Sequence, residues 1–102
     1  GLHGWNAADI GAPKGTAIYA AAGGTVIVAN GSGSWNGGYG SYVVIQHQNG
    51  TQTLYAHMSK VLVSPGAQVD QGDTIGKVGS TGESTGPHLH FEVRGAANPF
   101  AK

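Results

Sequence analysis

The sequence predicts an all-β domain, and three observations point to this class. Runs rich in Val, Ile, Thr and Tyr recur along the 102 residues and read as short strands. The 19 glycines supply tight turns between these runs. No segment has the 3.6-residue apolar period of an amphipathic helix. Short strands at such regular spacing are typical of a β-sandwich or a barrel.

The expected strands comprise residues 16–20, 25–29, 42–47, 51–57, 61–63, 74–78 and 88–94. Asn49-Gly50 predicts a hairpin between two of them, since both residues tolerate the positive φ of a type I′ turn. Two polar, glycine-rich loops stand out at residues 30–40 and 79–87, the first with Trp35 and Tyr39. Such loops carry binding contacts over a rigid sheet, although both also suit plain hairpin connections.

Composition excludes several classes of function. The formal net charge is zero and no basic stripe is present, so we expect no nucleic-acid partner. There is no cysteine for a disulfide or a thiolate zinc site, and no apolar run long enough to span a membrane. Nothing demands a dimer, so a monomer is expected. Residues 1–102 suffice for one domain, and the start at Gly1 rather than Met indicates a domain excised from a longer protein.

The segment His88-Leu-His90-Phe-Glu-Val is the most informative stretch of the chain. Side chains alternate along a strand, so both imidazoles lie on one face, with Cα atoms about 6.6 to 6.8 Å apart. The apolar residues between them point to the other face, where a core needs them. Two histidines on a polar strand face suit a metal and a proton shuttle, which makes a hydrolytic zinc site the leading hypothesis.

A catalytic zinc takes three protein ligands, and here only nitrogen and carboxylate donors are present. His3 and Asp9 flank a polar stretch near the start of the chain. Asp9 stands beside Ala and Ile, and burying its charge is costly unless a cation pairs with it. A metal is therefore one interpretation of Asp9, and a turn or capping aspartate is the other.

Several separate segments together resemble the lysostaphin/LytM-type zinc metalloendopeptidases, the peptidoglycan endopeptidases of bacterial cell walls. The likeness runs from His3 to about Pro99 and keeps the order and spacing of the segments. They are Asp9-Ile-Gly-Ala-Pro-Lys-Gly-Thr after His3, Tyr55-Ala-His57, Gly79-Ser-Thr-Gly and Ser84-Thr-Gly-Pro-His88-Leu-His90-Phe-Glu.

The resemblance implies a zinc ion held by His3, Asp9 and His90, with His57 and His88 as catalytic residues. It implies a compact antiparallel β core, of sandwich or half-barrel type, with a groove between long loops. The implied substrate is the peptide part of peptidoglycan, either a cross-link or an interpeptide bridge. The implied location is the extracellular space, the periplasm or the cell wall of a bacterium.

One departure from the family pattern concerns the first ligand. Three residues usually separate the histidine from the aspartate, and here there are five. Trp5 stands at the usual position, and an indole nitrogen cannot bind zinc. Either a bulge through Gly4 and Asn6 lets His3 reach the metal, or that ligand is missing. A chain without the ligand would be an inactive LytM-type module that binds and activates another cell-wall hydrolase.

Positions along the expected strands suggest roles for the remaining polar groups. His88 neighbours His90 and is the expected acceptor of the water proton. His57, at the end of its expected strand, either donates to the oxyanion or holds His88. Glu92 either orients a histidine or pairs with Lys or Arg at the sheet edge. His47, next to the predicted hairpin turn, is expected to be structural.

Overall fold

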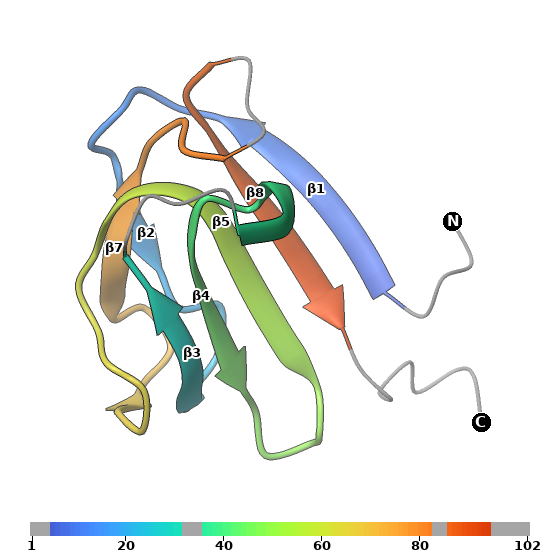
Figure 1. Ribbon diagram of the computed structural model, residues 1–102. Helices are drawn as coiled ribbons and strands as arrows, with labels where there is room; N and C mark the ends of the chain where they lie inside the picture. Colours follow the sequence, from blue (N-terminus) through green and yellow to red (C-terminus); the bar gives the residue numbers. More distant parts are fainter. Residues whose placement is uncertain (1–4, 32–35, 83–85, 95–102) are drawn as a thin grey trace.

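The computed structural model describes residues 5–31, 36–82 and 86–94, and nearly all of the regular secondary structure in these ranges is strand (Figure 1). The only helical element within these ranges is a 3-10 turn, η1, at Asn36–Gly38. The prediction of an all-β domain is confirmed. The strands in chain order are β1 (Trp5–Gly11), β2 (Ala17–Tyr19), β3 (Gly24–Asn30), β4 (Ser41–Gln46), β5 (Gln52–Val61), β6 (Gln68–Val69), β7 (Thr74–Val78) and β8 (His88–Arg94).

Every strand pair is antiparallel, and the main path of the sheet is β1-β8-β5-β4-β3-β6, with β7 on β5 and β2 on β7. Strand β5 is central and changes its partner along its length. Gln52 to Ala56 pair with β8, whereas Met58 to Val61 pair with β7. A strand that changes partner in this way bends one part of a sheet against another. The change takes place at His57.

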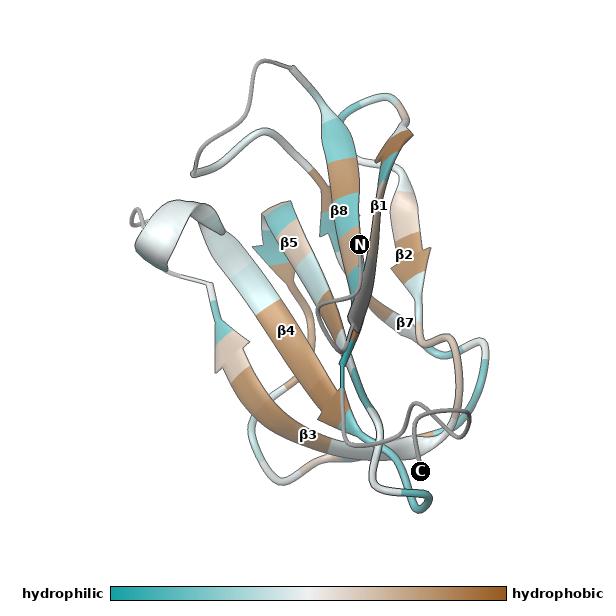
Figure 2. Cartoon of the chain, turned by 90° about the vertical axis from the view of Figure 1, so that its right-hand side faces the viewer, coloured by the Kyte–Doolittle hydropathy of each residue, from teal (hydrophilic) through white to brown (hydrophobic). Residues whose placement is uncertain are grey.

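Apolar side chains occupy both faces of the central strands. The larger cluster includes Ile45, Tyr55, Met58 and Ile75, all 1% exposed or less. A smaller cluster, Val44, Leu54 and Ala56, lies beneath the other face. Strand β8 alternates between hydrophilic and hydrophobic residues, as Figure 2 shows. Because Glu92 pairs with Leu54 and His90 with Ala56, the polar side chains of β8 share the face of the smaller cluster.

The expected strands at 74–78 and 88–94 have the predicted bounds, and those at 16–20, 25–29 and 42–47 differ by one or two residues. The expected strand at 51–57 continues to Val61 in β5, so the prediction that a strand ends at His57 is wrong, and of the expected strand at 61–63 only Val61 lies in a strand. Strands β1 and β6 were not predicted. Trp5–Gly11 is poor in residues that favour strands, and it forms one because seven consecutive residues pair with β8.

The predicted hairpin at Asn49-Gly50 joins β4 to β5, but its turn is not of type I′. Gly50 has φ +85° and its amide donates to the carbonyl of His47 at 3.0 Å, whereas Asn49 does not have positive φ. Since Gln46 pairs with Gln52, five residues make the connection. Loops of this length are commonly built around a type I turn, which needs fewer left-handed residues than type I′.

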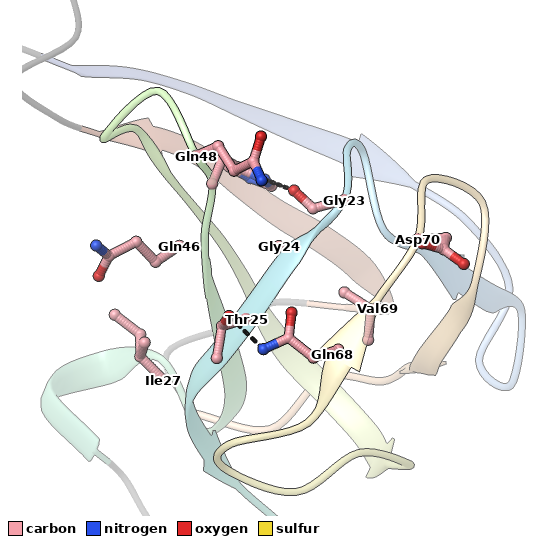
Figure 3. Close-up of a pocket in the computed structure, with 10 residues that line it drawn as sticks. Gly23, Gly24, Thr25, Ile27, Gln46, Gln48, Gln68, Val69 and Asp70 are labelled. Atoms are coloured by element: carbon pink, nitrogen blue, oxygen red, sulfur yellow. Dashed lines mark hydrogen bonds between the residues drawn. The ribbon is translucent and has the colours of Figure 1, made fainter.

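A hollow opens beside β3, β4 and β6, where the Gln68 amide donates to the Thr25 hydroxyl at 2.9 Å (Figure 3). Gln46 and Asp70 also line it, and none of Asp9, His57, His88 and His90 does. The groove expected between the two long loops stays a prediction, because residues 32–35 and 83–85 lie outside the described ranges. Within those ranges, no helix is long and apolar enough to cross a membrane.

Candidate active site

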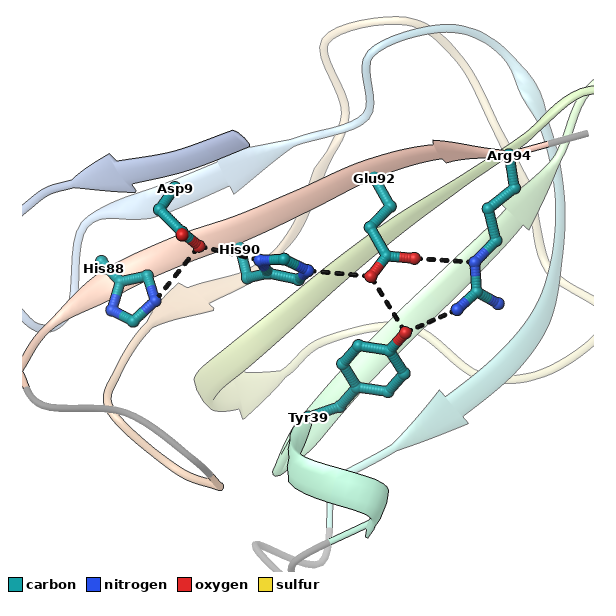
Figure 4. A network of polar contacts seen from close by, with 6 residues as sticks. All are labelled: Asp9, Tyr39, His88, His90, Glu92 and Arg94. Carbon is teal, nitrogen blue, oxygen red and sulfur yellow. Dashed lines mark hydrogen bonds and ion pairs between the residues drawn. The ribbon is translucent and has the colours of Figure 1, made fainter. Parts of the chain in front are cut away.

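Asp9 and His90 meet because their strands pair in register. Asp9 on β1 lies directly opposite His90 on β8, and directly opposed side chains project to the same face. Asp9 Oδ1 is 2.7 Å from His90 Nδ1 and 3.4 Å from His88 Nε2 (Figure 4). Both histidines of the His-x-His segment therefore reach one carboxylate oxygen, as their predicted common face requires.

His57 joins this group through a β-bulge. Ser41 pairs with Met58 and Val43 with Tyr55, so Ala56 and His57 together lie opposite the single residue between Ser41 and Val43. His57 has φ +60°, a left-handed conformation that a non-glycine residue rarely adopts. The ring of His57 has its centroid 4.7 Å from that of His88 and 5.9 Å from that of His90. The bulge thus brings a third imidazole to the face of Asp9.

Backbone carbonyls hold the rings of His57 and His88. His57 Nδ1 is 2.6 Å from the Thr81 carbonyl oxygen, and His88 Nδ1 is 2.9 Å from that of Gly86. Because a carbonyl oxygen only accepts, Nδ1 carries the proton in both rings, and Nε2 is the nitrogen that gains or loses the second one. Burial lowers the pKa of His57, and the charges of His88 and His90 lower it further, against the hydrogen bond to Thr81.

His90 lies between two carboxylates. Its Nδ1 faces Asp9 Oδ1 at 2.7 Å and its Nε2 faces Glu92 Oε2 at 2.8 Å. Ionised carboxylates only accept, so both nitrogens must carry protons unless a cation takes the place of one proton. Burial opposes protonation of His90, but the hydrogen bonds and charges of Asp9 and Glu92 outweigh it and raise its pKa.

The neighbouring imidazoles favour the ionised form of Asp9. The hydrogen bond from His90 lowers the pKa of Asp9 most, burial opposes this, and the charges of His90, His88 and His57 lower the pKa further. The Asp9 side chain is 65% exposed. The expectation of a buried aspartate is therefore wrong, because β1 pairs only with β8 and its residues 7–11 are exposed.

Glu92 lies deeper in the same face and is only 5% exposed. Its Oε1 accepts from Arg94 Nε at 2.7 Å, and its Oε2 accepts from the Tyr39 hydroxyl at 2.9 Å (Figure 4). Arg94 Nη2 donates to that hydroxyl at 2.6 Å. Glu92 therefore contacts a histidine and an arginine at once, so its two interpretations do not exclude each other.

Two loops meet beside His57, and Thr81 links them. The Thr81 hydroxyl accepts from the Ser41 amide at 3.0 Å and donates to the Met58 carbonyl at 2.8 Å. Gly82 has φ +76°, and a Cβ there would collide with the backbone nitrogen of Gly40. The carbonyl that orients His57 is thus held by close backbone packing, which only glycine permits at this point.

Two expected residues, His3 and Trp35, lie outside the described part of the chain. Residues from Trp5 to Gly11 pair with β8 one to one, so there is no bulge at Asn6, and Gly4, the other residue of the expected bulge, lies outside the described ranges. Within the described ranges, no group of three His, Cys, Asp or Glu residues is arranged to hold a metal.

Sequence reasoning did not single out Thr81 and Arg94. Arg94 lies two residues beyond Glu92, and strand alternation places both on one face, so this signal was present. Thr81 acts through its backbone carbonyl, for which no signal exists in a side-chain pattern. His47 is buried near the β4–β5 turn, with Nδ1 2.8 Å from the Gly23 carbonyl oxygen and Nε2 2.8 Å from the Thr53 hydroxyl.

Comparison with known proteins identifies the family. The sequence profile of peptidase family M23 matches residues 3–101. The chain belongs to peptidase family M23. It is 50% identical over 96 residues to the DD-carboxypeptidase/endopeptidase Mpg of Neisseria meningitidis, which covers 91% of the chain and 21% of that protein. The murein hydrolase activator EnvC of Escherichia coli is 43% identical over 90 residues, covering 88% of the chain and 20% of EnvC.

Solved structures agree with this assignment. The catalytic domain of lysostaphin from Staphylococcus simulans matches with a TM-score of 0.77 and 35% identity, over 92% of the chain and 71% of that domain. A zinc-containing peptidase from Vibrio cholerae matches with a TM-score of 0.76 and 40% identity, over 85% of the chain and 26% of that protein. The predicted resemblance to lysostaphin-type peptidases is confirmed. The chain spans about a fifth of the length of the curated relatives that it matches.

Proposed function

We propose that the chain is a zinc-dependent endopeptidase that hydrolyses peptide cross-links or interpeptide bridges of bacterial peptidoglycan. The observation that carries the proposal is the meeting of Asp9, His57, His88 and His90 on one sheet face, with Asp9 Oδ1 2.7 Å from His90 Nδ1. Membership of family M23 supports it, as do relatives named for endopeptidase activity.

The proposed zinc ligands are His3, Asp9 and His90. The donor set fits zinc, because a carboxylate oxygen and an imidazole nitrogen face each other and Glu92 binds the opposite nitrogen of that imidazole. When bound, zinc polarises the scissile carbonyl and lowers the pKa of a water molecule. His3 would complete the set of three protein ligands, and its position is part of the proposal.

His88 is the proposed acceptor of the proton from the attacking water. Its Nε2 lies 3.4 Å from Oδ1 of Asp9, a proposed zinc ligand, and is therefore next to the proposed metal site. His88 would then return that proton to the leaving amine. Burial lowers the pKa of His57, so this ring stays neutral near pH 7. The His57 ring has its centroid 4.7 Å from that of His88, and while neutral it does not repel the positive charge that His88 gains. The Nε2 atom of His57 can also take part in the proton transfer.

The proposed substrate and location come from the relatives. One is named a DD-carboxypeptidase/endopeptidase and another a peptidoglycan DD-endopeptidase. We infer that the chain acts on peptidoglycan peptides in the periplasm, in the cell wall or outside the cell of a bacterium. A glycine bridge and a direct cross-link both remain in the proposal, and the expected monomer is a prediction.

The second candidate function is an inactive module that activates another cell-wall hydrolase. The observation that favours it is the 43% identity to a protein named murein hydrolase activator. The five residues between His3 and Asp9 also leave room for it. Retention of Asp9, His57, His88 and His90 in one cluster supports the enzyme over the activator.

The test is digestion of purified sacculi with glycine-bridged or directly cross-linked walls, with one equivalent of zinc and products identified by mass spectrometry. His88→Gln removes the proposed proton acceptor, and His47→Gln makes the same change at a histidine outside the cluster. We expect cross-link fragments from the parent and His47→Gln chains, and none from His88→Gln. Zinc binding without cleavage of either wall would contradict the endopeptidase and favour the activator.

A further inference from the structure

We propose that Glu92 is a positioning residue: held by Arg94 and Tyr39, it keeps a proton on Nε2 of His90 and so directs the Nδ1 lone pair toward the metal. The inference deepens the proposed zinc centre and rests on it. It concerns a side chain that takes no part in the reaction itself and that acts only through His90.

The His90–Glu92 contact decides which nitrogen of the imidazole carries the proton. His90 Nε2 and Glu92 Oε2 are 2.8 Å apart, which is a hydrogen-bond distance. A carboxylate has no proton to give, so the imidazole must be the donor. A neutral imidazole that donates from Nε2 has its lone pair on Nδ1, and Nδ1 is the atom that faces Asp9.

Hydrogen-bond donors surround both carboxylate oxygens of Glu92. Arg94 Nε donates to Oε1 at 2.7 Å, and the Tyr39 hydroxyl donates to Oε2 at 2.9 Å. With His90, three donors therefore point at two oxygens, and all three stabilise the ionised carboxylate. The Tyr39 hydroxyl accepts from Arg94 Nη2 at 2.6 Å, which turns its own hydrogen toward Glu92.

The hydrogen-bonded group of Glu92, Tyr39 and Arg94 is rigid. The Glu92 side chain is 6% exposed, and the Tyr39 ring lies nearly parallel to that of His90, at 27° and with centroids 6.0 Å apart. Glu92, Tyr39 and Arg94 thus fix both the plane of the imidazole and the position of its proton. Outer partners of this kind typically contribute about 10- to 100-fold to metal affinity.

Replacing Glu92 by Gln separates this role from general packing, because the amide has almost the same shape. If the amide oxygen faces His90, the amide nitrogen faces the Arg94 N–H, and two donors oppose each other. If the amide nitrogen faces His90, the imidazole proton moves to Nδ1 and occupies the position that the metal needs. Either orientation weakens zinc binding.

Removing Arg94 should restore binding in the same variant. In Glu92→Gln/Arg94→Met no donor opposes the amide nitrogen, so the amide oxygen can accept from His90 Nε2. If Glu92 had a merely structural role, the losses of zinc affinity from the two substitutions would instead add up. The matched control is Asp73→Asn, the same acid-to-amide change in a turn, where Asp73 Oδ2 accepts from the Asp70 amide at 2.8 Å.

The experiment measures zinc affinity of the full chain by competition with a chromophoric chelator, with thermal unfolding to verify each fold. We expect Glu92→Gln to bind zinc at least about tenfold more weakly. The double variant should recover most of this loss, and Asp73→Asn should match the parent. In the zinc-bound parent, proton NMR should show a slowly exchanging imidazole N–H from His90 that Glu92→Gln lacks.

The outcomes separate this inference from the proposed function. A parent chain that binds no zinc would overturn both. A parent that binds zinc while Glu92→Gln binds it equally well, or a double variant weaker than the single one, would overturn the positioning role alone. Should Glu92→Gln fail to fold, Tyr39→Phe decides: severalfold weaker zinc binding supports the role, and unchanged affinity overturns it.

Discussion

His47 and His90 each have both ring nitrogens within hydrogen-bond distance of oxygen atoms, but those oxygens differ in kind. His47 contacts the Gly23 carbonyl and the Thr53 hydroxyl, whereas His90 contacts two carboxylates. One neutral imidazole satisfies the partners of His47, by donating from Nδ1 and accepting at Nε2. No neutral imidazole satisfies both partners of His90.

The partners of His47 continue into a complete chain of donors and acceptors. The Thr53 hydroxyl is 2.7 Å from the Tyr55 hydroxyl, which accepts from the Ala21 amide at 3.0 Å. Burial raises the pKa of Tyr55, so this hydroxyl keeps its proton and can donate. Every group is satisfied without a cation. The comparison teaches that the partners of a buried histidine, rather than its burial, indicate whether it can bind a metal.

The same substitution at both histidines should give the largest difference in zinc affinity. His90→Gln removes a proposed ligand, so zinc affinity should fall about 100-fold or more, beyond the range of outer partners. His47→Gln should leave zinc affinity unchanged and lower the free energy of unfolding by about 1 to 2 kcal/mol. Isothermal titration with zinc and urea denaturation measure the two effects. Equal zinc affinities in both variants would refute the distinction.

A second comparison concerns two glycines with positive φ. A Cβ at Gly82 would collide with the backbone of Gly40, whereas Gly66, with φ +91°, has nothing within 4 Å of such an atom. Gly66→Ala therefore bears only the backbone cost, about 1 kcal/mol. Gly82→Ala should lose about 2 to 3 kcal/mol and also displace the Thr81 carbonyl that holds His57. Urea denaturation measures both losses of stability. Equal losses would show that the loop can move enough to accommodate a Cβ at Gly82.

The strain at His57 allows a finer test within the site. At φ +60° glycine is less strained than alanine, so His57→Gly should be more stable than His57→Ala by about 1 kcal/mol. Both variants lack the imidazole, so both should lose cell-wall hydrolysis. The order of their stabilities is measured by denaturation. Alanine as the more stable of the two would mean that the bulge relaxes once the ring is removed.

The smallest expected effect is on the pH dependence of stability without metal. Burial lowers the pKa of His57 in the folded chain, so near pH 6.5 the unfolded chain binds more protons at this residue. Its contribution to stability is present above that pH and is lost as the pH falls toward the lowered value. Between pH 7.5 and 5, metal-free His57→Gln should therefore lose less stability than the parent. A steeper loss in the variant would contradict this sign.

Local patterns made part of the fold and site predictable. The bounds of β8, and the common face of His88 and His90, depend only on alternation along one strand. The turn at Asn49-Gly50 likewise depends on the backbone freedom of a few adjacent residues. The bounds of β8, the common face and the position of the turn were predicted correctly because each is decided within about seven residues of chain, whereas the type I′ assignment of the turn was wrong.

Long-range pairing decided the remainder. Trp5–Gly11 has little intrinsic preference for a strand, and only its pairing with β8 places Asp9 against His90. Alternation along β5 would send His57 to the face of Tyr55, and one bulged residue reverses this.

Local patterns in the sequence are enough to assign the residue types of the site and the common face of His88, His90 and Glu92 on β8. Only the folded chain brings Asp9 to His90 and the Thr81 carbonyl to His57, because these partners lie far apart in the sequence. The physical reason is that side-chain direction follows from local backbone geometry. Contacts between distant segments depend instead on strand register and on close backbone approach, which no local pattern encodes.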